Sequence, residues 1–214
     1  MPADLSVHPV LAVIAAQRLL PVLRSADADA AVRETAALLA AGCRAVELTT
    51  STPGWAEAVG RAATLTDAQN RPAVIGLGTV TTGEDAERAL DAGAAFLVSP
   101  CASAEVREVA NRRGALFVEG GFTPGEVAAA ARHAGVAKVF PAHVGGPQYI
   151  RTLKAVLPQV RLVPTGGIAL GQIGEWLDAG AFAVGIGSGL PADPAELAAV
   201  FARLAAVDEG EAAR

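Results

Sequence analysis

The sequence predicts an α/β fold, a (β/α)8 barrel of the TIM type with one extra N-terminal helix. Short apolar runs recur along the 214 residues, and an Ala-rich stretch with apolar residues at i, i+3 and i+4 follows each run. Because parallel strands need a crossover helix between them, this alternation predicts a parallel sheet. Eight such units in about 200 residues fit a small barrel better than an open doubly wound sheet, which is the alternative.

The elements follow in order along the chain. Segment 8–17 is expected to form the extra helix, at the bottom of the barrel, and residues 1–214 are expected to form a single domain. Glycines at 42, 93, 135 and 180 each end a helix and turn the chain into the next strand. An open dinucleotide-binding sheet would need a glycine-rich turn after the first strand, but 24–27 reads Arg-Ser-Ala-Asp. The expected strands are 19–23, 44–48, 73–77, 95–98, 115–118, 136–140, 161–164 and 182–186.

Composition excludes several classes of function. The net charge of -5 gives no basic face for nucleic acid, and no apolar run reaches the roughly 18 to 20 residues that span a bilayer. The N-terminus does not resemble a secretory signal, so we expect a cytoplasmic protein. Cys43 and Cys101 do not form a disulfide framework, and Cys101 is expected to be a small apolar filler. His8, His133 and His143 show no metal-ligand spacing, so no metal or cofactor is expected.

Two glycine-rich loops follow the last two expected strands. One contains Thr165, Gly166 and Gly167, and the other is a Gly-x-Gly-Ser that ends in Ser188. Glycines let the backbone approach a ligand closely, and exposed N–H groups at this end of a barrel favour an anion. The pair therefore indicates a phosphate site. The alternative is that these glycines only make tight turns.

Lys138 and Glu47 are charged residues inside apolar strands. The chain has 17 basic residues, of which only Lys138 and Lys154 are lysine. An ammonium that faces a barrel interior loses hydration, which disfavours its charged form, and a neutral amine attacks carbonyl groups to form a Schiff base. The alternative is a structural ion pair between the two residues. Because a buried pair is a poor source of stability, their joint presence beside a phosphate site favours catalysis.

Other polar residues at strand ends give weaker signals. Arg24 ends the first strand and could hold a substrate carboxylate in a bidentate pair, or it could be a solvated loop residue. Thr79 follows the third strand and could hydrogen-bond substrate or cap the next helix.

Five strings in this chain resemble one enzyme family, the 2-keto-3-deoxy-6-phosphogluconate and 4-hydroxy-2-oxoglutarate aldolases. They read AVELTTSTPGW, VIGLGTV, FLVSPC, AKVFPAHVGGPQYIRTLKAVLP and VPTGGI, in family order from about residue 19 to 205. The resemblance implies a metal-independent class I aldolase that is usually a homotrimer. It places the Schiff-base lysine on Lys138 and the acid/base glutamate on Glu47. It places the keto-acid site on Thr79, Pro100 and Phe140, and the phosphate site on Thr165, Gly166, Gly167 and Ser188.

The chain departs from the commonest family pattern at three positions. Ser51 stands where many members have a carboxylate-binding arginine, whereas Arg24 matches a branch that carries this arginine after the first strand. Glu119 replaces a usual proline, and His143 stands where Glu or Ser is common.

The function that the resemblance implies is cleavage of 2-keto-3-deoxy-6-phosphogluconate to pyruvate and glyceraldehyde 3-phosphate, with 4-hydroxy-2-oxoglutarate as a further substrate. The C4 epimer, the phosphogalactonate substrate, is the alternative within the family. A phosphate-binding barrel isomerase or synthase is a more remote alternative, because it would share the glycine loops but would not need the lysine. A sugar-phosphate binding protein would have no reason to keep both Lys138 and Glu47.

Overall fold

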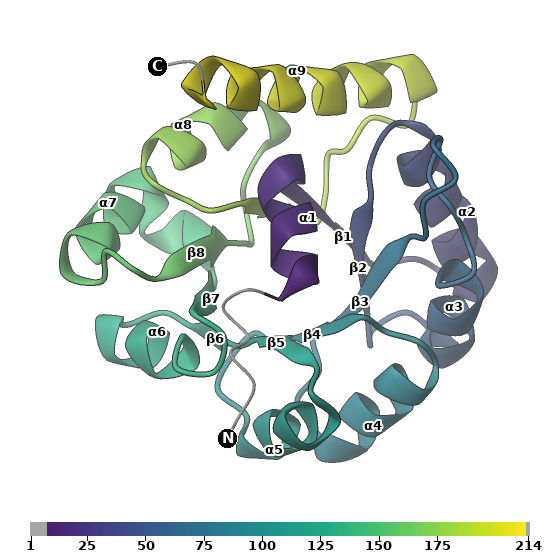
Figure 1. The fold of residues 1–214 in the computed structure, drawn as a ribbon, viewed down its shortest axis with the longest axis horizontal. Coiled ribbons are helices and arrows are strands. Elements are labelled where there is room, and N and C mark those ends of the chain that lie inside the picture. Colours follow the sequence, from purple (N-terminus) through teal and green to yellow (C-terminus); the bar gives the residue numbers. More distant parts are fainter. Residues whose placement is uncertain (1–7, 213–214) are drawn as a thin grey trace.

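The computed structural model describes residues 8–212, and the side chains of residues 8–205. It is an α/β fold in which parallel strands curl around a common interior and helices lie outside them (Figure 1). The strands are β1 (Leu19–Leu23), β2 (Ala45–Thr49), β3 (Val74–Gly78), β4 (Phe96–Val98), β5 (Leu116–Val118), β6 (Gly120–Gly121), β7 (Val136–Val139), β8 (Arg161–Pro164) and β9 (Val184–Ile186).

Most of the helices connect successive strands and cover the outer face of the curled sheet. They are α1 (Pro9–Gln17), α2 (Ala28–Ala40), α3 (Trp55–Ala62), α4 (Gly83–Asp91), α5 (Ala104–Arg113), α6 (Pro124–Ala130), α7 (Gly146–Val156), α8 (Ile173–Asp178) and α9 (Pro194–Ala212), with short 3-10 helices at Ala142–Val144 and Leu170–Gln172. No helix in residues 8–212 is both long enough and apolar enough to cross a bilayer.

The strands form two hydrogen-bonded groups, in the orders β5-β4-β3-β2-β1-β9 and β6-β7-β8. Every pairing between these strands is parallel, and the register places Glu47 beside Val22 and Gly76 and places Lys138 beside Gly120 and Val163. The predicted α/β class and the parallel sheet are therefore confirmed.

The helix ends follow from local sequence. Gly42, Gly93, Gly135 and Gly180 all have φ between 67° and 104°, the left-handed region that glycine enters without steric cost. At the other end of a helix, the Thr123 hydroxyl and the Glu126 carboxylate form a capping box that starts α6.

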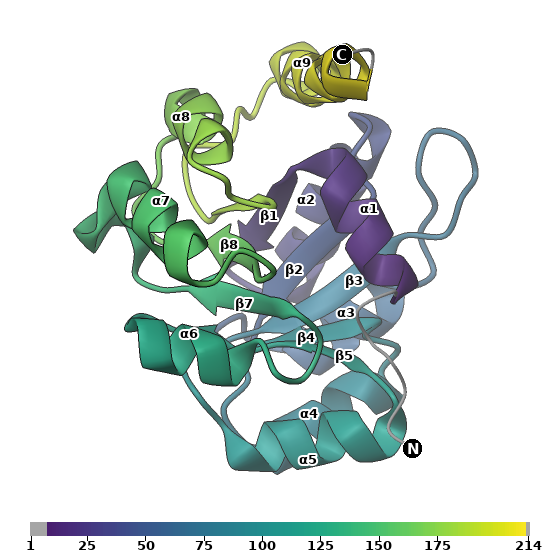
Figure 2. The same cartoon turned by 60° about the vertical axis from the view of Figure 1, so that its left-hand side comes forward.

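Helix α1 lies across the amino ends of the strands, in the middle of the ring in Figure 1 and against one end of the sheet in Figure 2. Its buried Leu11 and Ile14 belong to the same apolar cluster as Leu20, Ala45 and Phe96 on the strands. The helix expected at 8–17 therefore forms, with His8 as its N-cap, and it closes this end of the interior.

One short strand was not expected. The expected strand 115–118 forms as β5, and after Glu119 the chain continues into a further short strand, β6, which joins the second group. The Glu119 side chain is fully buried, and Arg107 of α5 donates hydrogen bonds to both of its carboxylate oxygens, at 3.0 and 2.5 Å. The sequence gives no sign of this long-range pair.

Candidate active site

Lys138 and Glu47 meet inside the curled sheet. The Lys138 Nζ lies 3.5 Å from Glu47 Oε1, and the two side chains are 4% and 1% exposed. They come from β7 and β2, which are not neighbours in either group of strands. The side chains therefore reach each other across the interior, as the sequence analysis expected.

The floor beneath this pair is apolar. Leu11 and Ile14 of α1, together with Leu20, Val98 and Val118 of the strands, line a cavity of about 10 Å³ that Lys138 and Glu47 also line. The cavity is too small to admit more than a single water molecule. The amine and the carboxylate are thus shielded from solvent on this side, and a ligand has to approach from the carboxyl ends of the strands.

Room for the Glu47 carboxylate is created by a glycine. A Cβ atom on Gly78 would lie 1.9 Å from Glu47 Oε1, far inside van der Waals contact. Gly76, two residues earlier on the same strand, makes room in the same way for the Phe96 ring. Sequence reasoning did not assign these glycines, although an inward-facing glycine in a strand often indicates the close approach of another group.

The glycine loops lie at the carboxyl ends of β8 and β9. Gly166 and Gly167 have φ of 96° and 69°, so each is in a conformation that disfavours other residues. In the described part of the chain we find no protein acceptor for the backbone N–H groups of Gly166, Gly167 or Ser188. Free N–H groups of this kind form an anion-binding concavity.

Thr165 links these loops to the interior. Its side chain is buried and lines the same small cavity as Lys138, and its backbone forms a parallel bridge with Gly185 of β9. The Phe140 ring packs on Gly166, and the Lys138 Nζ lies 5.6 Å from the centre of that ring. Phe140 and Thr165 therefore lie near the amine, and Gly166 lies against Phe140.

Arg24 reaches toward the loop after β9. Its guanidinium would be 2.7 Å from a Cβ atom on Gly187, and it lines a cavity of about 490 Å³ together with Ser188 and Arg33. A volume of this size holds a small organic ligand. Arg24 thus lies beside one glycine loop, directly after β1, the strand that pairs with the Glu47 strand β2.

Thr79 carries backbone strain. Its φ is +60°, which is rare for a β-branched residue, and its carbonyl accepts a hydrogen bond from the Thr50 hydroxyl at 3.0 Å. Strained residues of this kind cluster at functional sites. Pro100, at the end of β4, packs closely against Gly120, where a Cβ would lie 2.4 Å from the Pro100 carbonyl carbon.

The structure shows the surroundings of three further residues near the site, His143, Ser51 and Cys101. The Nδ1 atom of His143 lies 3.3 Å from the Gly166 carbonyl oxygen, and its ring packs on Gly167, so it supports the first glycine loop. Ser51 accepts or donates a hydrogen bond to Thr49 at 2.8 Å. Cys101 is exposed, so the expectation that it fills an apolar gap is wrong: the chain has left β4 at Ser99 and turns outward there.

Within residues 8–212, no three His, Cys, Asp or Glu side chains are placed to hold a metal ion together. The groups that the site brings together are an amine, a carboxylate and a set of backbone N–H donors. The curled parallel sheet, the buried amine and the adjacent glycine loops define the class: an α/β protein that can hold a small anionic molecule beside a lysine.

The chain belongs to the KDPG and KHG aldolase family, whose family model matches residues 10–201. It is 33% identical to the 2-dehydro-3-deoxy-6-phosphogalactonate aldolase of Escherichia coli (strain K12) over 174 residues, 80% of this chain and 83% of that protein. It is also 33% identical to the 2-dehydro-3-deoxy-phosphogluconate aldolase of Pseudomonas aeruginosa over 164 residues, 75% of this chain and 72% of that protein.

Solved structures give the same family. The 4-hydroxy-2-oxoglutarate and 2-dehydro-3-deoxyphosphogluconate aldolase from TTHB1 superposes with a TM-score of 0.79 at 34% identity, covering 92% of this chain and 97% of that one. The KDPG aldolase of Legionella pneumophila, with pyruvate captured as a covalent carbinolamine, superposes with a TM-score of 0.73 at 27% identity. It covers 92% of this chain and 97% of that one. A designed cage of fused symmetric oligomeric domains superposes with a TM-score of 0.78 at 30% identity, covering 90% of this chain and 73% of the cage chain.

Proposed function

We propose that this chain is a class I aldolase that cleaves 2-keto-3-deoxy-6-phosphogluconate to pyruvate and glyceraldehyde 3-phosphate, and that it also accepts 4-hydroxy-2-oxoglutarate. One observation carries the proposal: a lysine amine and a glutamate carboxylate lie 3.5 Å apart, both buried, in an apolar interior. Family membership supports it, because the relatives named above are aldolases for these substrates.

In the proposed reaction, Lys138 Nζ attacks the C2 ketone and forms a carbinolamine, which loses water to give a protonated imine. Glu47 donates the proton that leaves with this water. It then accepts the C4 hydroxyl proton through a water molecule as the C3–C4 bond breaks. The bond electrons flow into the imine, the aldehyde leaves, and the resulting enamine is protonated at C3. Hydrolysis of the imine then releases pyruvate and restores Lys138.

The remaining residues hold the substrate in this proposal. Arg24 and nearby backbone amides bind the carboxylate, and Thr79, Pro100 and Phe140 shape the space around the keto acid. Thr165, Gly166, Gly167 and Ser188 bind the 6-phosphate through N–H groups and hydroxyls. No metal or cofactor takes part in the steps that these residues perform.

A second substrate is supported by one finding. The E. coli relative acts on the phosphogalactonate epimer and is as similar to this chain as the phosphogluconate enzyme of P. aeruginosa. Assays with both epimers, with the released pyruvate measured, distinguish the two substrates.

We also propose that residues 1–214 form one domain, a closed (β/α)8 barrel with α1 as its extra helix. The two seams between the groups of strands support closure. At one seam the chain runs from β5 into β6 through Glu119 alone, and at the other the Phe182 N–H, just before β9, donates to the Leu162 carbonyl of β8 at 2.8 Å.

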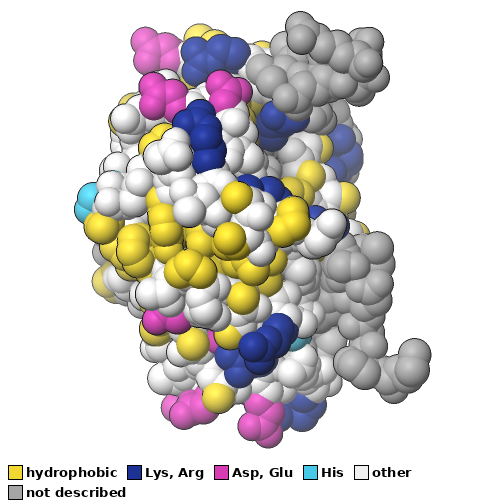
Figure 3. All heavy atoms as spheres, turned by 90° about the vertical axis from the view of Figure 1, so that its left-hand side faces the viewer, with side chains coloured by type: hydrophobic (Ala, Val, Ile, Leu, Met, Phe, Trp, Pro, Cys, Tyr) yellow, Lys and Arg dark blue, Asp and Glu magenta, His cyan; other side chains and the backbone are white. Residues whose placement is uncertain are grey.

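We expect a homotrimer in the cytoplasm. Apolar side chains gather over α6 and α7 (Figure 3). Val144, just before α7, and Val156, the last residue of α7, are 64% and 62% exposed. A surface of this kind is typical of a subunit contact. The similar chain in the designed cage, which was built from symmetric oligomeric domains, also supports an oligomer.

The test of the aldolase proposal is borohydride reduction in the presence of pyruvate, followed by peptide mass analysis. We expect one pyruvate-derived adduct, on Lys138. The chain offers a matched control, because Lys154 is its only other lysine. Lys154→Arg should keep the adduct and the activity, whereas Lys138→Arg should lose both. A folded protein that forms no adduct with excess pyruvate would overturn the proposal.

A further inference from the structure

A second cavity lies at the opposite end of the sheet from the glycine loops. It has a volume of about 340 Å³ and is bounded by α1, α9 and the residues that precede β2 and β3. Val13 and Ala16 of α1 and Phe201 of α9 give it an apolar wall, and Arg44 and Arg71 lie on the other side. This combination of size, apolar lining and a few polar groups is typical of a small-molecule site.

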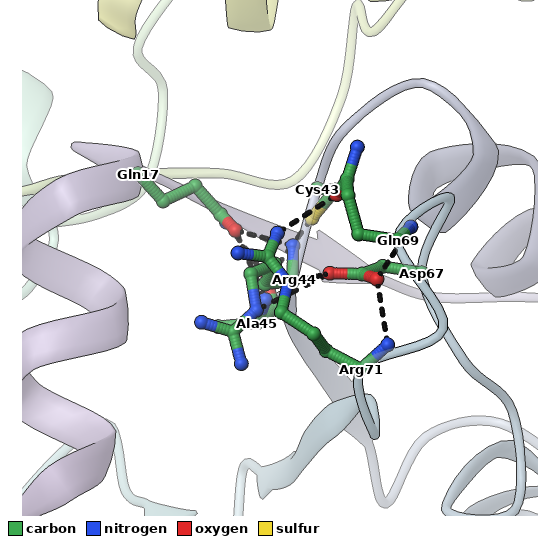
Figure 4. Close-up of polar contacts among 7 residues, drawn as sticks. All are labelled: Gln17, Cys43, Arg44, Ala45, Asp67, Gln69 and Arg71. Carbon is green, nitrogen blue, oxygen red and sulfur yellow. Dashed lines mark hydrogen bonds and ion pairs between the residues drawn. The ribbon is translucent and has the colours of Figure 1, made fainter.

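The two arginines share one carboxylate. Asp67 Oδ2 lies 2.7 Å from Arg71 Nε and 3.3 Å from Arg44 Nε, and Figure 4 shows both side chains gathered at Asp67 beside α1. The other oxygen, Oδ1, accepts hydrogen bonds at 2.9 Å from the backbone N–H groups of Gln69 and Arg71. Both oxygens of the Asp67 carboxylate are therefore occupied. Because Asp67 carries one negative charge and the two arginines carry two positive charges, one positive charge stays uncompensated among these three residues.

One buried donor of Arg44 lacks an aligned acceptor. Its Nε is buried and forms no aligned hydrogen bond with any described residue, although Asp67 is near. Its contact with Asp67 is the only ion pair recorded for it in the described part of the chain. A buried guanidinium donor without an acceptor is costly, and an anion in the cavity would relieve that cost.

The cavity is held in shape by Gln17. The Gln17 Oε1 accepts hydrogen bonds from the Arg44 and Ala45 N–H groups at 2.7 and 2.9 Å, and its Nε2 donates to the Ala45 carbonyl at 2.9 Å. These bonds fasten the end of α1 to the start of β2. The apolar wall and the arginine wall are thus fixed relative to each other.

We propose that this cavity binds a small organic anion, with its carboxylate or phosphate on Arg44 and Arg71 and its apolar body against α1 and α9. The site does not depend on the proposed aldolase activity. It is separated from the interior by α1 alone, because Leu11 and Ile14 on the same helix line the cavity of Lys138 and Glu47.

The test is calorimetric titration of the protein with phenyl phosphate, which carries a phosphate monoester and an apolar ring. We expect Arg44→Gln and Arg71→Gln each to weaken binding by about tenfold or more, because each removes charge-assisted hydrogen bonds. Arg151→Gln is the matched control, since it removes the same charge from an exposed position on α7 and should leave binding unchanged.

Two further variants keep the proposal falsifiable if loss of an arginine disturbs the fold. Ala16→Trp fills the cavity from an exposed position on α1 without changing any charge, and it should abolish this binding. Arg24→Gln changes a residue at the opposite end of the sheet and should leave the binding of phenyl phosphate in this cavity intact. Binding that survives Ala16→Trp, or that is lost only in Arg24→Gln, would overturn the proposal.

Discussion

Glu47 owes its position to the residue next to it in space, Gly78. The backbone of Gly78 is compatible with alanine, but an alanine Cβ would lie 1.9 Å from Glu47 Oε1. We therefore expect Gly78→Ala to displace the carboxylate and to lower kcat by roughly 10²-fold or more, the range seen when a general acid or base is lost. Steady-state kinetics of the variant and the unchanged protein measure this fall in kcat.

The control for that substitution is Gly125→Ala on α6, where a Cβ meets nothing within 4 Å. It should keep full activity. If Gly78→Ala is folded and equally active, the interior carboxylate does not have the role proposed for it.

Glu119 and Arg107 form a pair whose two members differ in burial. Glu119 is fully buried, whereas the Arg107 side chain is 37% exposed. Arg107→Ala leaves the buried carboxylate with one remaining donor, the Ser103 N–H. We expect a loss of about 2–3 kcal/mol in the free energy of unfolding, measured by urea denaturation. Arg151→Ala, at an exposed site, should cost less than about 0.5 kcal/mol.

Asp67 allows a prediction of how the stability of the protein changes at acidic pH. Its burial opposes ionisation, but hydrogen bonds from the Arg71 N–H, the Arg71 guanidinium and the Gln69 N–H outweigh this and hold the pKa of the Asp67 carboxyl below its ordinary value. Because the pKa is lowered by folding, the contribution of Asp67 to stability is present above its ordinary pKa of about 3.9 and is lost as the pH falls through the folded value.

Asp67→Asn should therefore destabilise the protein at neutral pH and flatten its loss of stability below about pH 4. Melting temperatures followed by circular dichroism across this range measure the effect. Parallel curves for the two proteins would mean that Asp67 does not titrate differently in the folded state.

At the scale of the element, α1 is predicted to matter beyond its own stability. Ile14 is 2% exposed, and it lines the cavity below Lys138 and Glu47. Ile14→Ala should cost about 2–5 kcal/mol in unfolding free energy and enlarge that cavity. Water admitted there would hydrate Lys138, so we expect adduct formation with pyruvate to change as well. Leu204→Ala on α9, at a similarly buried site away from the interior, should cost stability but leave adduct formation unchanged.

The elements themselves could be predicted from sequence because their signals are local. The first expected strand, 19–23, coincides with β1, and the expected strand 161–164 coincides with β8, since helix-ending glycines or loop residues bound these apolar runs. The short strand β6 was not predicted, because its two glycines give no local strand signal.

The same distinction applies to the site. Lys138 and Glu47 were found because a charge inside an apolar strand is conspicuous, whereas the strain at Thr79 and the space at Gly78 arise only when strands pack. Gln17 was missed for a related reason: its polar side chain bonds backbone groups 28 residues away.

At the scale of the whole molecule, we expect the apolar surface over α6 and α7 to form the contact between subunits. A monomer that exposed Val144 and Val156 to this degree would leave large side chains in water, and contact with a second copy would bury them. If the trimer forms through this face, Val144→Asp places a charge in a desolvated contact and should shift the protein toward monomers. Light scattering at several concentrations measures the mass, which is 21.5 kDa for one chain.

Ala40→Asp supplies the matched control, because Ala40 is an exposed alanine at the end of α2, away from this face. It adds the same charge and should leave the assembly unchanged. A wild-type protein that stays monomeric at every concentration would refute the trimer, and dissociation by both substitutions alike would show that charge, not this face, governs assembly. Because Val144 adjoins His143, which supports the Gly166–Gly167 loop, the dissociated variant should also bind phosphorylated substrate more weakly, raising KM more than it lowers kcat.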